Sequence, residues 1–179
     1  MIQEKLKNIK LLLLDVDGVL TDGRITFTDD GRELKSFNSK DGVGLKLLQH
    51  MGIKAGIVTA RTSPIVARRC KELGIDLIFE GVHVKAQVLP DVIERTGLAP
   101  AEIAYMGDDL IDVGLMKKVA VGIAPADAHA VVLAHADLVT KSIGGVACVR
   151  EACDMILKAR GLWDQAVSEM LGDISIEPR

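Results

Sequence analysis

The chain is poor in aromatic residues, in cysteines and in clustered positive charge, and each shortage excludes a class of protein. Aromatic residues are 3% of the 179, and the net charge is −3 with no basic run, so we expect no nucleic-acid-binding surface. No apolar stretch approaches the length of a membrane span. The three cysteines, Cys70, Cys148 and Cys153, show no Cys-x-x-Cys spacing. They indicate buried thiols in a reducing compartment.

The remaining composition is typical of a globular domain. Apolar residues make up 49% of the chain and charged residues 26%, which suits a chain of this length with one core. We therefore predict a single domain over residues 1–179. The first ten residues, MIQEKLKNIK, lack the apolar core of a signal peptide, so we expect a cytoplasmic protein.

One stretch, LLLLDVDGVLTDG at residues 11–23, organises the rest of the chain. Its uniformly apolar start predicts a strand that is buried on both faces of a parallel sheet. Asp15 and Asp17 follow this strand, and residues two apart on an extended segment point the same way. Two carboxylates beside a core are costly unless a group such as a divalent cation compensates their charge. Taken alone, the motif fits a plain Asp-rich turn equally well.

Strand-like and helix-like segments alternate along the whole chain. This alternation predicts an α/β fold, a doubly wound parallel sheet with helices on both faces. Asp29-Asp30-Gly31 predicts a β-hairpin flap over residues 24–37, and Pro90 predicts a kink or a late start in one helix. The expected strands are residues 11–14, 53–58, 75–79, 103–106, 119–123 and 137–140. The expected helices are residues 42–51, 63–73, 85–95, 109–118, 127–134 and 146–160, followed by a partly helical tail to residue 179.

The polar residues of interest each follow one of these strands. In a doubly wound sheet such residues meet along the carboxyl edge, where ligands bind. Each has a plain alternative as well: a helix N-cap for Thr59, a solvated surface position for Lys85, and an acidic first helical turn for the GDDLID segment. The predicted set is Asp15, Asp17, Thr59, Arg61, Lys85, Asp108, Asp109 and Asp112.

Such a set suits phosphoryl transfer. Asp15 can attack phosphorus as a nucleophile, and Asp17 can protonate the leaving alcohol and then deprotonate water. Asp15 and Asp108 can supply the carboxylates that Mg²⁺ prefers. Thr59 and Lys85 can hold the phosphoryl oxygens.

The motifs resemble those of the haloacid dehalogenase superfamily. Within it, DVDGVLTDG, FNSKDGVGLK, TAR, GDDLIDV and SIGGVACVRE resemble the small capless phosphatases of 3-deoxy-D-manno-octulosonate 8-phosphate, over residues 9–159. This resemblance implies a phosphatase of lipopolysaccharide biosynthesis without a separate cap domain. It places Asp15, Asp17 and Asp108 on Mg²⁺, Asp17 through its main-chain carbonyl, with Asp109 and Asp112 just outside the ligands. It places toward the sugar acid Asn38, Ser39, Lys40, Asp41, Gly42, Lys46, Arg61 and Arg69.

The resemblance also implies a homotetramer, with hairpins and C-terminal tails at the interfaces. Independently, the spacing from Asp17 to Thr59 and from Lys85 to Asp108 leaves no room for a lid domain. A closed site would then need neighbouring subunits. Two segments depart from the family pattern. In GVHV, Val84 stands just before Lys85, where relatives usually have a polar residue or Asp, and GGVACVRE lacks a third glycine.

Three alternatives remain open from the sequence. A phosphatase for a nine-carbon sialic-acid-type 9-phosphate is disfavoured by Arg61, where such relatives tend to carry an acidic residue. A phospho-accepting receiver domain is disfavoured by the Asp-x-Asp spacing and by Phe79-Glu80-Gly81, where a receiver carries its phosphorylated Asp. A catalytically silent binding domain is disfavoured by the full acidic set.

Overall fold

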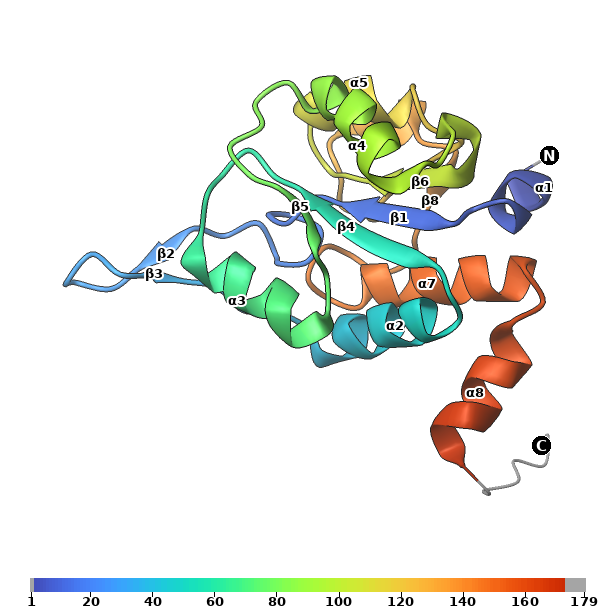
Figure 1. Cartoon of the computed structure of the whole chain (residues 1–179). Helices are drawn as coiled ribbons and strands as arrows, with labels where there is room; N and C mark the ends of the chain where they lie inside the picture. Colours follow the sequence, from blue (N-terminus) through green and yellow to red (C-terminus); the bar gives the residue numbers. More distant parts are fainter. Residues whose placement is uncertain (1, 173–179) are drawn as a thin grey trace.

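A six-stranded parallel sheet forms the centre of the protein, as the alternating pattern predicts (Figure 1). The computed structural model describes residues 2–172. The strand order is β5-β4-β1-β6-β7-β8, and every neighbouring pair is parallel. The strands are β1 (Leu11–Leu14), β4 (Lys54–Val58), β5 (Leu77–Phe79), β6 (Ile103–Met106), β7 (Val121–Ala124) and β8 (Leu138–Val139).

The four leucines of β1 serve two cores on opposite faces of the sheet. Leu12 and Leu14 pack in one core, whereas Leu11 and Leu13 pack in the other, and all four are fully buried. The first core is covered by α2 (Ser39–His50), α3 (Pro64–Leu73) and α7 (Cys148–Ala159); the second is covered by α4 (Leu89–Thr96), α5 (Val113–Met116) and α6 (Ala130–His135). This two-sided burial explains why an alternating strand pattern is absent here.

Helix starts depend on local capping and differ from the predicted bounds. Helix α2 begins at Ser39, three residues earlier than predicted, because the side chain of Asn38 accepts a hydrogen bond from the Lys40 amide (2.9 Å). Residues Lys85–Val88 form a 3₁₀ turn (η1), and α4 starts only at Leu89 with Pro90 in its first turn. The late start indicated by Pro90 is therefore confirmed.

Other boundaries were predicted less well. The expected helix 109–118 is divided into η3 (Leu110–Asp112) and the short α5, while α6 and α7 start a few residues later than predicted. The N-terminal α1 (Ile2–Lys7) was not predicted, because only Leu6 of it is buried and its apolar periodicity is weak. The expected partly helical tail contains α8 (Trp163–Leu171); its last residues, 173–179, lie outside the described part.

The predicted hairpin is a short antiparallel ribbon that projects away from the sheet (Figure 1). Its strands, β2 (Thr26–Phe27) and β3 (Glu33–Leu34), are shorter than expected. Gly31 lies in the turn with φ +82°, a conformation that glycine adopts without strain. Phe27 and Leu34 are 61% and 52% exposed. Within residues 2–172, no helix has the length and apolar character to span a membrane.

Candidate active site

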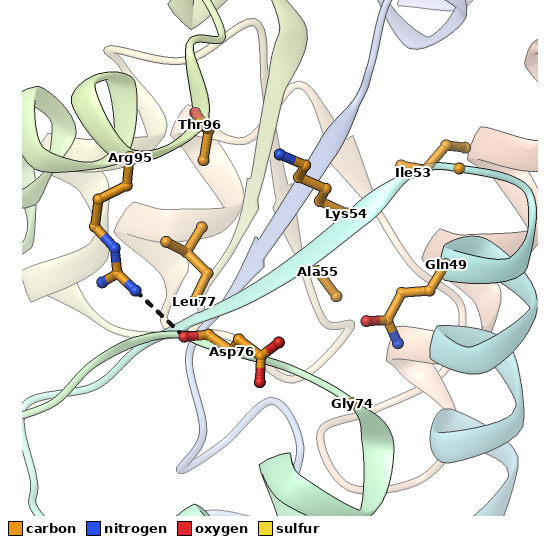
Figure 2. A pocket seen from close by; sticks show the side chains of 10 residues that line it. Gln49, Ile53, Lys54, Ala55, Gly74, Asp76, Leu77, Arg95 and Thr96 are labelled. Atoms are coloured by element: carbon orange, nitrogen blue, oxygen red, sulfur yellow. Dashed lines mark hydrogen bonds between the residues drawn. The ribbon is translucent and has the colours of Figure 1, made fainter.

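A cavity of about 540 Å³ lies at the amino ends of β4 and β5 (Figure 2). Lys54, Leu77 and Arg95 line it, and the Arg95 guanidinium donates a hydrogen bond to the Asp76 carbonyl (3.3 Å). It is at the wrong end of the sheet for the predicted chemistry, because the candidate catalytic residues follow the carboxyl ends of the strands. We therefore place the active site at the opposite edge.

The carboxyl edge brings together the residues that the sequence predicts there. Asp15 follows β1, Thr59 follows β4 and Asp108 lies just beyond β6, and these three strands are neighbours. Ser63, not Thr59, precedes α3, so the N-cap alternative for Thr59 is wrong. These side chains surround a cavity of about 240 Å³ whose lining includes Asp15, Asp17, Thr59, Arg61, Asp108 and Asp109.

Lys85 is fully buried and is the central cation of this site. Its Nζ lies 2.6 Å from Asp15 Oδ2 and 2.6 Å from Asp112 Oδ1, so the alternative of a solvated surface lysine is wrong. The Tyr105 hydroxyl donates to the same Asp112 oxygen (2.5 Å). A buried ammonium needs such partners, because an unpaired charge in the interior is strongly unfavourable.

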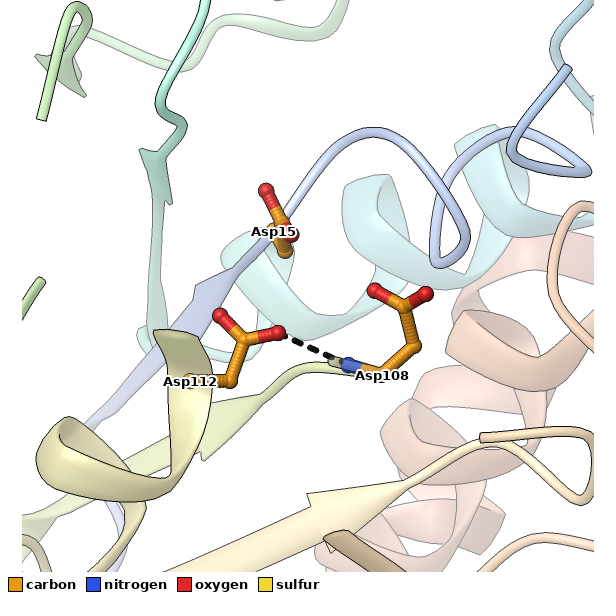
Figure 3. A group of neighbouring side chains, drawn as sticks. All are labelled: Asp15, Asp108 and Asp112. Atoms are coloured by element: carbon orange, nitrogen blue, oxygen red, sulfur yellow. Dashed lines mark hydrogen bonds between the residues drawn. The ribbon is translucent and has the colours of Figure 1, made fainter. Parts of the chain in front are cut away.

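Asp112 organises the loop after β6 rather than facing the cavity. Its Oδ2 accepts hydrogen bonds from the amides of Asp108 (2.9 Å) and Asp109 (3.0 Å), and Figure 3 shows the bond to Asp108. Together with Lys85 and Tyr105, these contacts occupy both of its oxygens. The contacts support the prediction that Asp112 lies just outside the metal ligands.

Asp15 and Asp108 lie side by side next to Asp112, close enough to share one cation (Figure 3). Ligand atoms from Asp15, Asp108 and Asp112 all lie within 4.8 Å of one another. Asp108 Oδ1 is buried without a hydrogen-bond partner among residues 2–172, which is unfavourable unless a cation meets it. Gly18 makes room for this carboxylate, since a Cβ there would lie 2.0 Å from Asp108 Oδ2. Oxygen donors of this kind fit Mg²⁺.

The charges in this cluster oppose one another when no cation is present. Burial raises the pKa of Asp15 to about 6, and Asp112 adds to the rise while Lys85 counteracts it. Burial also raises the pKa of Asp108 to about 7, with Asp15 and Asp112 contributing. A divalent cation between these carboxylates would offset the negative charges that add to both pKa values.

Asp17 is held by Lys35, which the sequence analysis did not predict, and by the predicted site residue Arg61. Its Oδ1 forms an ion pair with Lys35, and its Oδ2 lies 3.8 Å from Arg61 Nε. Glu33 Oε1 accepts a hydrogen bond from Arg61 Nη2 (2.8 Å) and lies 3.5 Å from Lys35 Nζ. Glu33 and Lys35 alternate with Leu34, so period-two alternation in the predicted strand could have placed both charges on one face.

The predicted substrate-contacting stretch divides into two groups. Asn38 caps α2, Ser39 and Lys40 are its first residues, and the Asn38 side-chain amide also donates to the Gly145 carbonyl (3.3 Å). Asp41 is instead buried, and its Oδ1 accepts a hydrogen bond from the main-chain amide of Arg150 (2.7 Å).

Gly42, Lys46 and Arg69 also lie outside the lining of the cavity that contains Asp15. Gly42 packs against Arg69, since a Cβ there would lie 2.5 Å from Arg69 Nη2. Arg69 bonds Glu72 (3.3 Å), and Lys46 lines a groove against α8. The substrate contacts of this whole set stay predictions: Asn38, Ser39, Lys40, Asp41, Gly42, Lys46 and Arg69.

Comparison with known proteins identifies the family. A model of haloacid dehalogenase-like hydrolases matches residues 75–147. The 3-deoxy-D-manno-octulosonate 8-phosphate phosphatase KdsC of Escherichia coli (strain K12) is 43% identical over 167 residues, which cover 93% of this chain and 89% of that protein. The chain belongs to this phosphatase family. The Haemophilus influenzae member is 40% identical over 159 residues, which cover 89% of this chain and 88% of that protein.

Solved structures of the phosphatase family agree with the fold. The enzyme from Moraxella catarrhalis, in complex with a magnesium ion, a phosphate ion and a 3-deoxy-D-manno-octulosonate (KDO) molecule, has a TM-score of 0.92 and 38% identity. The match covers 94% of this chain and 97% of that one. The cobalt-bound Haemophilus influenzae enzyme has a TM-score of 0.87 and 38% identity, over 91% and 98% of the two chains. Family membership decides against the receiver-domain alternative.

Proposed function

We propose that this protein is a Mg²⁺-dependent phosphatase that converts 3-deoxy-D-manno-octulosonate 8-phosphate to 3-deoxy-D-manno-octulosonate and phosphate, in lipopolysaccharide biosynthesis. The observation that carries this proposal is the buried Lys85 joining Asp15 to Asp112, beside an Asp108 oxygen that has no hydrogen-bond partner in the described part of the chain. The relatives reported above are named for the eight-carbon substrate. We therefore prefer it to the nine-carbon alternative.

The proposed reaction has two displacements. An oxygen of Asp15 forms a bond to phosphorus while the bond to the sugar oxygen breaks, and Asp17 gives its proton to that oxygen. Water then attacks the phosphorus of the aspartyl-phosphate, gives its proton to Asp17, and the bond to Asp15 breaks. Ester and water become alcohol and phosphate.

Other side chains hold the reacting groups in place. The Val16 amide donates to Asp15 Oδ1 (2.7 Å) and Lys85 lies at Oδ2, so the carboxylate has a fixed orientation for attack. Thr59 and Lys85 would hold phosphoryl oxygens. Asp15, Asp108 and the Asp17 carbonyl would hold Mg²⁺, which offsets the charge of nucleophile and phosphate.

The proposal is tested by measuring phosphate release from a panel of phosphorylated sugar acids, with Mg²⁺ and with a chelator. We expect the highest kcat/KM for the eight-carbon 8-phosphate, a lower value for a nine-carbon 9-phosphate, and no turnover in the chelator. Equal activity on all esters, or activity that survives metal removal, would contradict the proposal.

Arg61 is expected to bind the substrate carboxylate. It is 44% exposed on its side chain and lines the cavity, and Glu33 holds its guanidinium. Arg61→Ala should lower kcat/KM for the sugar acid phosphate by the equivalent of about 2–4 kcal/mol, the scale for losing a charge-assisted pair. p-Nitrophenyl phosphate, which has no carboxylate, should be affected little.

Arg68→Ala is the matched control for Arg61→Ala, because Arg68 is exposed on α3 and pairs with Glu72 (3.2 Å). It should leave both substrates unchanged. Equal losses on both substrates in Arg61→Ala would assign Arg61 to the phosphoryl site or to the fold instead.

We propose a homotetramer whose interfaces include the ribbon and the C-terminal tail. Exposed Ile25, Phe27 and Leu34 on the ribbon support this, since a lone two-stranded ribbon is marginally stable. Light scattering at micromolar concentration should give a particle of about four times 19.2 kDa. Phe27→Glu should dissociate it, whereas Val131→Glu on α6 should not. A 19.2 kDa particle alone would disprove assembly.

We also propose that the chain is one cytoplasmic domain over residues 1–179, without a separate cap. The single domain is supported by the elements of residues 2–172, which form one six-stranded sheet, the helices that cover it, and the ribbon. The ribbon would then act as the flap.

A further inference from the structure

The ribbon brings a buried cation to the edge of the active-site cavity. The Lys35 side chain is 1% exposed, although the preceding residue, Leu34 of β3, is 52% exposed. Its ammonium pairs with Asp17 and lies 3.5 Å from Glu33 Oε1. Burying an ammonium is unfavourable without such carboxylates, so the ion pairs account for the enclosed position of Lys35.

We propose that Lys35 is a positioning residue that holds the Asp17 carboxylate for its work as general acid and base. This inference rests on the proposed phosphatase function. Because Lys35 is enclosed, it acts through Asp17 and not by touching substrate. Its contact with Oδ1 leaves Oδ2 of Asp17, which lies 3.8 Å from Arg61 Nε, as the oxygen that exchanges the proton.

A fixed Asp17 matters because the same carboxylate serves both displacements. It gives a proton to the sugar oxygen and then takes one from water, and both transfers require hydrogen-bond reach. A carboxylate free to rotate would spend part of its time out of reach. Lys35 therefore gives the ribbon a role in the reaction in addition to its proposed role in assembly.

Glu33 is the second anchor in this arrangement. It holds Lys35 and Arg61 together, and the Ser63 hydroxyl donates to its other oxygen (3.4 Å). Burial raises the pKa of Glu33, but the charges of Lys35 and Arg61 outweigh burial and leave that pKa lowered. Glu33 thus stays ionised and links the ribbon to the start of α3.

The test is the dependence of kcat/KM on the leaving group, measured with a series of substituted phenyl phosphates. The kcat/KM value reports formation of the aspartyl-phosphate, in which the leaving oxygen needs its proton. In Lys35→Met, kcat/KM for the ester with the poorest leaving group should fall by about 10²-fold, the lower end of the contribution of general acid catalysis. p-Nitrophenyl phosphate, whose leaving group scarcely needs a proton, should lose far less.

Three variants control this experiment. Lys35→Arg keeps a cation at Asp17 and should restore most of the wild-type dependence. Glu33→Gln removes only the outer anchor and should change the dependence in the same direction by a smaller factor. Arg32→Met removes a ribbon cation that is 79% exposed and pairs with Asp30, so it should match the wild type.

Either of two results would overturn the inference. Equal losses across the whole series in folded Lys35→Met protein would mean that Lys35 supports the fold or the phosphoryl site. Unchanged kcat/KM values in Lys35→Met would mean that Asp17 does not need Lys35 to hold it. Failure of the proposed substrate would look different: the wild type would cleave phenyl phosphates but not the sugar acid phosphate, and the leaving-group comparison would still apply.

Discussion

Asp15→Asn protein will fold normally and will release no detectable phosphate from any ester. The amide keeps the size of the side chain but has no charge to attack phosphorus, and it weakens the proposed metal site. The fold should tolerate the change because burial already raises the pKa of Asp15 to about 6 and so favours a neutral group there. Phosphate release with Mg²⁺ and circular dichroism measure the two expectations.

Asp17→Asn is the informative comparison for Asp15→Asn. Transfer to Asp15 should survive with a good leaving group such as p-nitrophenolate, but hydrolysis of the aspartyl-phosphate should stall. Folded Asp15→Asn protein that keeps more than a few per cent of wild-type turnover would exclude covalent catalysis by Asp15. Unchanged turnover in Asp17→Asn would show that Asp17 is not the general acid and base.

The parts of the fold that were predictable are those with local causes. The leucine run of β1 and the strand 103–106 have the predicted bounds, because a strand buried on both faces leaves a continuous apolar run. Pro90 indicated the late start of α4 because proline lacks the amide that a helix interior requires. The convergence of Asp15, Thr59 and Asp108 followed from parallel topology alone.

The parts that were missed depend on contacts between distant segments. The pair of Lys35 with Asp17 joins residues 18 apart, and the hydrogen bond between Asp41 and the Arg150 amide spans 109 positions. The Tyr105 hydroxyl meets Asp112 in the core, a contact that the predicted strand 103–106 does not reveal. Period-two alternation can place Glu33 and Lys35 on one face of the ribbon, but no local pattern encodes which distant residue a charged side chain will meet.

Lys85→Met should be the most destabilising single change at the active site. Lys85 lies 2.6 Å from both Asp15 and Asp112 with no exposed surface, and removing one partner of a buried ion pair typically costs about 3–5 kcal/mol. Phosphatase activity should disappear as well, because the phosphoryl group and Asp15 lose the same cation.

The stability loss in Lys85→Met should grow with pH. Lys85 lowers the pKa of both Asp15 and Asp108, which burial raises to about 6 and about 7; without it both values rise further. In the unfolded chain both aspartates have a pKa of 3.8. Above that pH the folded variant binds more protons than the unfolded chain. Its free energy of unfolding therefore falls as pH rises. Denaturant unfolding with a chelator should show a smaller deficit at about pH 5 than at about pH 8. Lys118→Met, at an exposed position, is the control and should change the free energy of unfolding by no more than about 0.5 kcal/mol. If the stability loss in Lys85→Met did not change with pH, lost packing and not unpaired carboxylates would be responsible.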